Sequence, residues 1–249
     1  MSDKVALILT NYNLPERTDA LIERIRRDVR WPLDYYVVDN GSDLQPLSQY
    51  TTVPLAKNRQ TTGGWLAGLK AAKASGEKYL AYWFLITSAE IPDGAGDILT
   101  PMASWLVAHP DAVGVHPALT ADSTTHWMHL LARAANCPRQ TWMIDNIASL
   151  YRADWFDEIG WFDPCLIYAW GIDLETCWLA RRGNRTLWVD ERARVKKVTD
   201  IGYKLNRMRM TADERQVKAT ENMHQVLSAK YGRGWWEMMS YDNVTGDML

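Results

Sequence analysis

Residues 35–42 read Tyr-Tyr-Val-Val-Asp-Asn-Gly-Ser, an apolar stretch that ends abruptly at an acid and a turn. Residues 5–13 follow the same plan, since Val-Ala-Leu-Ile-Leu is followed at once by Thr-Asn-Tyr-Asn. Short apolar runs of this kind are typical of buried strands in a parallel sheet. In open α/β sheets, ligands bind outside the carboxyl ends of such strands. The two strand ends therefore predict a ligand site that includes Thr10, Asn11, Asn13 and Asp39.

The segments around these two strands predict an alternating α/β fold. Pro15 begins a stretch with helical spacing of apolar residues that continues to about residue 30. Further elements are expected in this order: a small-residue helix at 65–75, a buried strand at 79–86, a helix at 98–109 and a strand at 112–115. The β-α-β-α-β order with short loops predicts a Rossmann-like, mostly parallel sheet flanked by helices.

The second half of the chain is less regular. Residues 116–141 have the character of a variable excursion, after which the pattern predicts a strand at 142–151, a helix at 174–182 and a strand at 186–189. Thr211 and Glu214 have the spacing of a capping box, which predicts a final amphipathic helix to about residue 230. An aromatic and then acidic tail follows.

All 249 residues are expected to form one domain, because no linker, internal repeat or low-complexity run divides them. Within this domain we expect a nucleotide-binding half at 1–115, an acceptor and catalytic half at 116–210, and a C-terminal helix with its tail at 211–249.

Composition excludes several classes of protein. A net charge of −2 leaves no basic footprint for nucleic acid. Three cysteines without a CxxC pair argue against a disulfide framework or a zinc ribbon, and favour a reduced, cytoplasmic location. The amino terminus runs straight into a strand and does not resemble a signal peptide. The longest apolar run, at 79–86, is too short to span a bilayer, so we expect at most peripheral membrane contact. Thirteen tryptophans offer flat apolar faces on which sugar rings could stack.

Several motifs in this order resemble the inverting glycosyltransferases of family 2, particularly rhamnosyltransferases, over residues 4–232. The two strand ends match, as does the spacing of Asn58, Gly64 and Gly68. Residues 158–163 (Glu-Ile-Gly-Trp-Phe-Asp) resemble the family's Gly-Gly-Phe-Asp turn, and residues 170–175 (Trp-Gly-Ile-Asp-Leu-Glu) resemble its Gly-Glu-Asp motif. The resemblance implies a GT-A fold and a nucleotide-sugar donor. It also implies that Asp39 reads the nucleotide base and that Asp173 is the catalytic base.

The chain departs from the family where a divalent metal normally binds. Residues 84–92 (Phe-Leu-Ile-Thr-Ser-Ala-Glu-Ile-Pro) put Ser88 where the metal-binding Asp belongs, and Lys196 and Lys197 stand where related enzymes often have a His ligand. A lysine and a hydroxyl can meet part of the charge that develops on a leaving diphosphate, which favours a reaction with no required cofactor. Because side chains alternate along a strand, only one of the two lysines is expected to face the site. Two alternatives remain: Glu90 moves in and keeps Mg²⁺ or Mn²⁺, or the site has decayed.

Other candidate residues carry a functional and a structural interpretation. Asp173 stands at a predicted helix start, where capping and the helix dipole are expected to lower its pKa. Asp39 also suits an Asx turn, and Gly64 tight helix packing. Trp170 is a candidate for stacking on the acceptor sugar, and Asp145 is a second-choice acid for the acceptor pocket. Arg207 and Arg209 either fold over the diphosphate or form a solvated basic loop.

The sequence thus predicts a hexosyltransferase-type enzyme that acts with inversion on a hydroxyl of a glycan, a glycolipid or a small acceptor. The main alternative is a non-catalytic module that binds a nucleotide sugar or a glycan on the same fold. A nucleotidyltransferase is disfavoured because the first strand is not followed by a Gly-rich, Lys-bearing loop. The presence of Asp173 favours an enzyme over a binding module.

Overall fold

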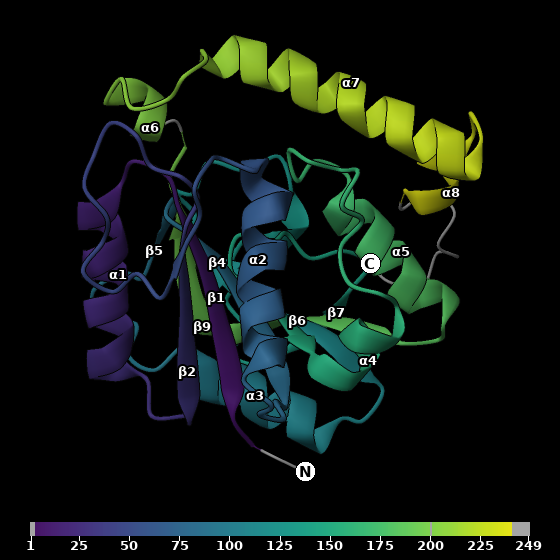
Figure 1. Cartoon of the computed structure of the whole chain (residues 1–249). Coiled ribbons are helices and arrows are strands. Elements are labelled where there is room, and N and C mark those ends of the chain that lie inside the picture. The colour runs from purple at the N-terminus through teal and green to yellow at the C-terminus, as the bar shows by residue number, and fades with distance from the viewer. Residues whose placement is uncertain (1–2, 200, 241–249) are drawn as a thin grey trace.

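A single sheet runs through the computed structural model of the chain, which describes residues 3–199 and 201–240 (Figure 1). Its strand β1 (Val5–Asn11) is completely buried. It pairs in parallel with β2 (Leu33–Asp39) on one side and with β4 (Ala81–Ile86) on the other. In this register Asn11 lies opposite Asp39. The carboxyl ends of the three strands therefore meet at one edge of the sheet.

The sheet is parallel in its N-terminal half and mixed beyond it. The order of the strands is β3 (Val53–Pro54), β2, β1, β4, β8 (Leu150–Arg152), β6 (Ala112–Leu119), β9 (Thr186–Lys197) and β5 (Ala89–Glu90), and β7 (Arg139–Thr141) pairs with β9. Strand β8 is antiparallel to both β4 and β6, while β9 is parallel to β6 and antiparallel to β5 and β7. The predicted α/β class is confirmed, and the predicted parallel pairing holds for β1 to β4.

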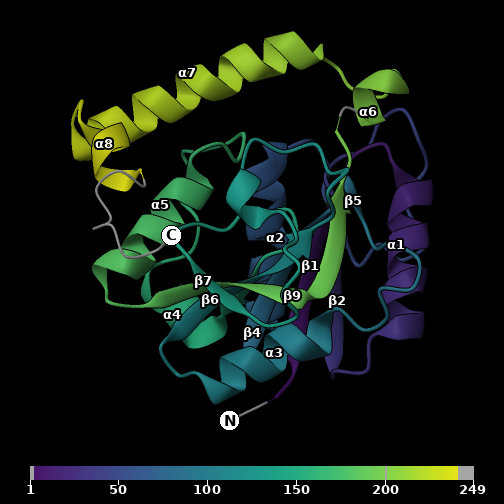
Figure 2. The same cartoon turned by 180° about the vertical axis from the view of Figure 1, so that it is seen from behind.

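Helices cover both faces of the sheet, as the alternation of side chains along β1 requires. Val5, Leu7 and Leu9 face α1 (Pro15–Asp28) and α3 (Leu99–Ala108), which lie on the face seen in Figure 2. Ala6 and Ile8 face the other layer, which consists of α2 (Gln60–Ala74), α4 (Ala153–Glu158) and α5 (Ile172–Arg182). Two apolar cores therefore lie on opposite sides of one buried strand.

Three expectations about elements need correction. The predicted strand at 142–151 is wrong for most of its length, because only its end belongs to β8. The preceding residues form a buried loop, in which the carbonyls of Ile147 and Ser149 still accept hydrogen bonds from the edge of β4. Strands β6 and β9 run further than predicted, since a register shift after Pro117 lets both continue. The predicted tail contains α8 (Trp235–Met239), and residues 241–249 of it lie outside the described residues.

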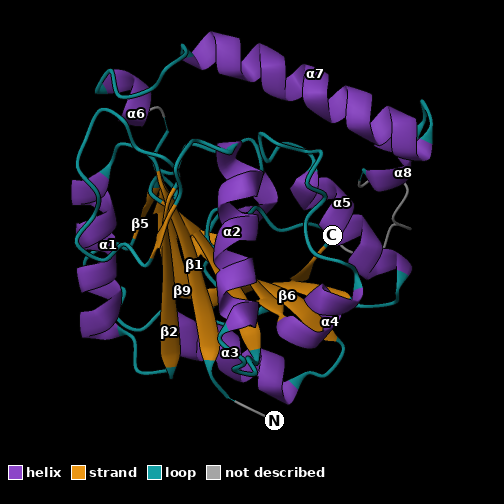
Figure 3. Cartoon of the chain, in the orientation of Figure 1, coloured by secondary structure: helices purple, strands orange, loops and turns teal. Residues whose placement is uncertain are grey.

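The C-terminal segment crosses the carboxyl edge of the sheet (Figures 1 and 3). It consists of α6 (Ile201–Lys204), a connecting loop and α7 (Ala212–Tyr231). The remaining short helix, η1 (Met128–Leu130), lies earlier in the chain and is not part of this segment. The capping box is confirmed, since Thr211 Oγ1 accepts from the Glu214 amide at 3.1 Å and the Glu214 carboxylate accepts from the Thr211 amide at 2.7 Å. At the other end of α7, Lys230 donates to Glu175 at 2.6 Å. None of the described helices is both long and apolar enough to cross a membrane.

Helix α2 approaches β1 and β2 so closely that only glycine fits at the contact. A Cβ atom on Gly68 would lie 2.6 Å from Ile8 Cγ2 and 2.9 Å from Val38 Cγ2. A Cβ atom on Gly64 would lie 2.8 Å from Thr10 Cγ2. These two glycines set the first turn of α2 directly beside the strand ends.

The close contact at Gly68 predicts that an alanine there destabilises the protein, although helix propensity alone would favour alanine over glycine. Gly→Ala normally gains up to about 1 kcal/mol in a helix interior. Because the new methyl group would overlap Ile8, we expect Gly68→Ala to lower the free energy of unfolding by about 1–3 kcal/mol. Urea unfolding measures this, with Lys70→Ala on the exposed side of α2 as the control. A Gly68→Ala variant as stable as the wild type would contradict the close packing.

Candidate active site at the carboxyl edge of the sheet

A cavity of about 500 Å³ lies at the carboxyl edge, between the strand ends and the C-terminal segment. One wall comes from the ends of β1 and β4 and the start of α2, and includes Thr10, Asn11, Asn58, Thr61 and Ser88. The opposite wall comes from α6, the loop after it and α7, and includes Met208, Arg209 and Arg215. Four of the predicted donor residues, Thr10, Asn11, Asn58 and Ser88, are thus brought together in one cavity.

Three other predicted donor residues lie behind this wall. The carboxylate of Asp39 is 1% exposed and accepts hydrogen bonds from Asn11 Nδ2 at 3.0 Å and from the amide and hydroxyl of Ser42 at 2.8 and 2.7 Å. Asp39 therefore acts as a turn-stabilising residue, which agrees with its structural interpretation, although its backbone partner is the amide three residues further on. Asn13 is also fully buried, and Gly64 serves the packing of α2. Direct contact of these three residues with a donor stays a prediction.

Asn13 joins the strand ends to the C-terminal segment. Its φ of 57° is in the left-handed region, which asparagine tolerates better than most residues. Its Oδ1 accepts from the amides of Asp43 and Leu44 at 3.0 and 2.9 Å, and its Nδ2 donates to the Arg207 carbonyl at 3.1 Å. The Arg207 guanidinium in turn donates to the Asn13 carbonyl at 3.3 Å. The basic loop is therefore docked onto the turn after β1.

Sequence reasoning missed several polar groups in the cavity wall, among them Tyr12 and Asp43. The Tyr12 hydroxyl donates to Asp43 at 3.2 Å, and Arg209 Nε donates to the same carboxylate at 2.9 Å. The hydrogen bond from Asn13, aided by Arg209, holds the pKa of Asp43 below its usual value. The only available signal was the position of Asp43 after the turn that follows β2.

A second group of charges surrounds Asp173, the predicted base. Asp173 is in the first turn of α5, and its Oδ1 accepts from the Leu174 amide at 2.9 Å. Lys197 Nζ and Asp145 Oδ2 form an ion pair at 2.7 Å, with side chains 22% and 15% exposed. Burial, and then the charge of Asp145, raise the pKa of Asp173 to about 7, against the opposing influence of backbone amides and Lys197.

The expected lowering of the pKa of Asp173 is therefore wrong. A helix N-terminus contributes roughly 0.3–1 kcal/mol at a surface position. Loss of hydration and a nearby like charge outweigh that contribution here. Nearby, His116 is fully buried, burial lowers its pKa to about 4, and its Nε2 has no hydrogen-bond partner among the described residues.

The two lysines point to different acids. Lys196 pairs with the exposed Asp122 and Lys197 pairs with Asp145, so the two side chains point in different directions. The expected contact of one of them with the donor stays a prediction. Neither lysine lines the cavity, and each would have to break an ion pair before it could bind a diphosphate.

The donor set at this edge does not fit a dedicated site for a divalent cation. Ser88 supplies a neutral hydroxyl to the cavity. The Glu90 carboxylate is held by Arg17 at 2.8 Å and lines a separate groove beside α1. Within the described part of the chain, no three His, Cys, Asp or Glu side chains gather in a way that could hold a metal ion. Mg²⁺ and Mn²⁺ favour carboxylate oxygens, and among the described residues this cavity offers one carboxylate, that of the ion-paired Asp43.

Trp170 stands in a strained turn directly before α5. Ala169 and Gly171 on either side of it have φ of 66° and 86°, and a Cβ atom on Gly171 would lie 2.8 Å from Met223 Cγ in α7. Backbone strain of this kind persists where the surrounding structure enforces it. The turn therefore fixes Trp170 close to Asp173 in the chain, and the acceptor role of Trp170 and Asp145 stays a prediction.

No protein-family model matches the chain, and no curated protein matches it. Two solved structures resemble it in fold. The crystal structure of GalNAc-T7 with UDP, GalNAc and Mn²⁺ superposes with a TM-score of 0.67 at 10% identity, over 94% of this chain and 49% of that one. The mannosyltransferase PcManGT from Pyrobaculum calidifontis, in complex with GDP-Man and Mn²⁺, superposes with a TM-score of 0.55 at 14% identity, over 98% and 76%.

These likenesses show that the chain has the GT-A glycosyltransferase fold, as predicted. The chain spans about half the length of the GalNAc-T7 chain. At such low identities the comparison concerns the fold alone, so substrates and mechanism belong to the proposals below.

The raised pKa of Asp173 predicts that ionisation of this carboxyl destabilises the folded chain. The folded state holds the proton more tightly than the unfolded state, whose pKa is about 3.9. The resulting stabilisation is fully present below about pH 4 and is lost as the pH rises to about 7. Asp173→Asn stays neutral, so we expect it to match the wild type near pH 4. At pH 8 its free energy of unfolding should be higher by about 1 kcal/mol or more, since one pKa unit is worth about 1.4 kcal/mol.

Asp154→Asn is the matched control for this measurement by urea unfolding. Asp154 is likewise the second residue of its helix, and it accepts from the next amide at 2.7 Å, but it is exposed. It should show no gain at pH 8. Equal stability of Asp173→Asn and the wild type at pH 8 would mean that Asp173 is not desolvated.

Proposed function

We propose that this chain is an inverting glycosyltransferase that moves a sugar from a nucleotide-sugar donor to a hydroxyl of a glycan, a glycolipid or a small acceptor. The observation that carries the proposal is Asp173, whose pKa of about 7 suits a general base. The GT-A fold and the cavity at the strand ends support a donor site at the carboxyl edge of the sheet. GalNAc-T7 is bound to UDP in its structure and PcManGT to GDP-Man, which supports the donor class.

The reaction needs one carboxylate and one stabilised leaving group. The acceptor oxygen forms a bond to the anomeric carbon, from the face opposite the diphosphate. The bond between that carbon and the diphosphate oxygen breaks, and its electron pair stays on the diphosphate. The acceptor proton passes to Asp173. A carboxylate whose pKa is raised in this way is a stronger base than an ordinary Asp.

Donor and acceptor roles follow from position. Thr10, Asn11, Asn58 and Ser88 line the cavity and contact the donor in this proposal. Asp39, Asn13 and Gly64 hold that wall in place, and any contact of theirs with the nucleotide would follow a rearrangement. Trp170, three residues before Asp173 in the chain, and Asp145, whose charge acts on Asp173, serve the acceptor. A cavity of about 500 Å³ is in the usual range for a small-molecule site.

We further propose a hexosyltransferase that does not require a divalent cation. Ser88 at the metal-Asp position and Glu90 paired with Arg17 support this, because neither offers a free carboxylate to the cavity. Positive side chains would then have to meet the charge on the leaving diphosphate.

The test is release of nucleoside diphosphate from a panel of nucleotide sugars, in EDTA and in added Mn²⁺. We expect turnover in EDTA, and a loss of about 10²–10⁴-fold in Asp173→Asn with little change in donor affinity. Asp154→Asn, the matched acid on α4, should keep wild-type turnover. Turnover only in Mn²⁺ would defeat metal independence. Donor binding without any turnover would favour the binding-module alternative.

The pH dependence of turnover tests the partner of the base. Asp145 raises the pKa of Asp173, so its neutralisation should lower that pKa. The base would then stay ionised in more acidic solution. We expect the acid limb of the kcat/KM profile to move to lower pH in Asp145→Asn, and to stay in place in Asp154→Asn. An acid limb that stays in place in both variants would mean that Asp145 does not influence the pKa of the base.

A further inference from the structure

The charges in the cavity wall are unevenly paired. Two cations line the cavity among the described residues, Arg209 and Arg215. Arg209 is neutralised by Asp43 at 2.9 Å, and Asp43 lines the same cavity. Arg215 forms no ion pair with a described carboxylate. Its Nη2 donates to the Tyr168 carbonyl at 3.1 Å and to the Thr61 hydroxyl at 3.4 Å, which are both neutral. Among the described residues, Arg215 is therefore the one guanidinium lining this cavity that no carboxylate neutralises.

The place of Arg215 in its helix makes this charge unfavourable for α7 itself. It is the fourth residue of α7, close to the N-terminal end, where the helix dipole favours anions and disfavours cations. The nearby Glu214 is engaged in the capping box and does not pair with it. A half-buried cation that has no carboxylate partner and lies at the positive end of a helix lowers the stability of the fold unless an anion binds to it.

We propose that Arg215 binds the terminal phosphate of the nucleoside diphosphate and stabilises its negative charge as the bond to the sugar breaks. This inference rests on the proposed function. A guanidinium presents two parallel N–H donors to two phosphate oxygens, which a lysine cannot do. Arg215 lines the same cavity as Ser88, so this cavity offers a diphosphate both a positive charge and a hydroxyl.

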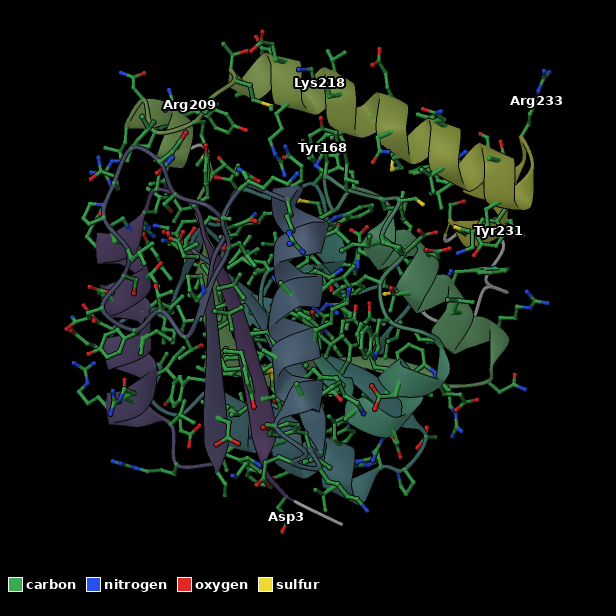
Figure 4. All side chains as sticks on the ribbon, viewed as in Figure 1. Asp3, Tyr168, Arg209, Lys218, Tyr231 and Arg233 are labelled. Atoms are coloured by element: carbon green, nitrogen blue, oxygen red, sulfur yellow. The ribbon has the colours of Figure 1, made fainter. Side chains whose placement is uncertain are left out.

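Arg215 is better placed for this role than Lys196 or Lys197. The lysines lie outside the cavity and are paired with Asp122 and Asp145. Withdrawal of Lys197 from Asp145 would also disturb the charges around Asp173. Arg215 needs only to give up hydrogen bonds to a carbonyl and a hydroxyl. Figure 4 shows Tyr168, which provides that carbonyl, beneath α7, and Arg209 beside α6.

Calorimetric titration in EDTA tests the assignment, with UDP and GDP compared with UMP and GMP. We expect Arg215→Ala to weaken binding of the better diphosphate by about 10–100-fold, in line with loss of a charged hydrogen bond. Affinity for the corresponding monophosphate should be unchanged, because it lacks the terminal phosphate. Arg215→Gln keeps neutral hydrogen bonds to Thr61 and Tyr168 but loses the charge, so it should show the same selective loss even if the alanine variant is unstable. Lys218→Ala, an exposed cation on the same helix that Figure 4 labels, should bind as the wild type does.

Each contrary result has a separate meaning. Unchanged diphosphate affinity in Arg215→Gln, or an equal loss for mono- and diphosphates, would overturn the role of Arg215 while nucleotide binding still upheld the donor site. Wild-type binding that requires Mn²⁺ would overturn the role as well, since a cation would then hold the diphosphate. No binding of UDP or GDP, nor of TDP, ADP or CDP, by the wild type with or without Mn²⁺ would defeat the proposed function itself.

Discussion

The buried carboxylate of Asp39 ties the ends of β1 and β2 together, and the candidate site is built on this connection. Three donors from Asn11 and Ser42 satisfy the carboxylate, which would otherwise be costly to bury. Ser42 Oγ then accepts from the Asn13 amide at 2.8 Å, and Asn13 holds the Arg207 carbonyl. One continuous chain of hydrogen bonds thus leads from the strand ends to the segment that closes the cavity. An acid at the end of a strand suggests ligand binding, but here Asp39 supports the wall of the cavity.

Close backbone packing is the second constraint, and it sets the positions of both charged groups. Gly64 and Gly68 bring α2 against β1 and β2, which places the Asn58–Thr61 region beside Thr10. Gly171 does the same for α7 over α5, since a Cβ atom there would lie 2.8 Å from Met223 Cγ. The proximity of α7 also carries Arg215 into the cavity.

The electrostatics of the edge follow one pattern, in which nearly every acid has a basic partner. Glu90 is paired with Arg17, Asp145 with Lys197, Asp122 with Lys196 and Asp43 with Arg209. This pairing leaves no free carboxylate for a cation among these four acids. Arg215 has no carboxylate partner among the described residues, so its guanidinium is available to bind an anion. The proposals of metal independence and of a diphosphate contact for Arg215 therefore rest on the same distribution of charge.

The sequence by itself determined the elements that depend on local pattern. The strand ends, the helices on both faces and the capping box of α7 were all predicted, because periodicity and cap chemistry act over a few residues. Tertiary structure alone decided which strand-end side chains face the cavity, so Thr10 lines it while Asp39 is turned inward. It also reversed the direction of the pKa shift of Asp173 and placed Arg215 opposite Ser88. Burial and contacts between residues distant in the sequence control these properties, and neither is visible in a local run of residues.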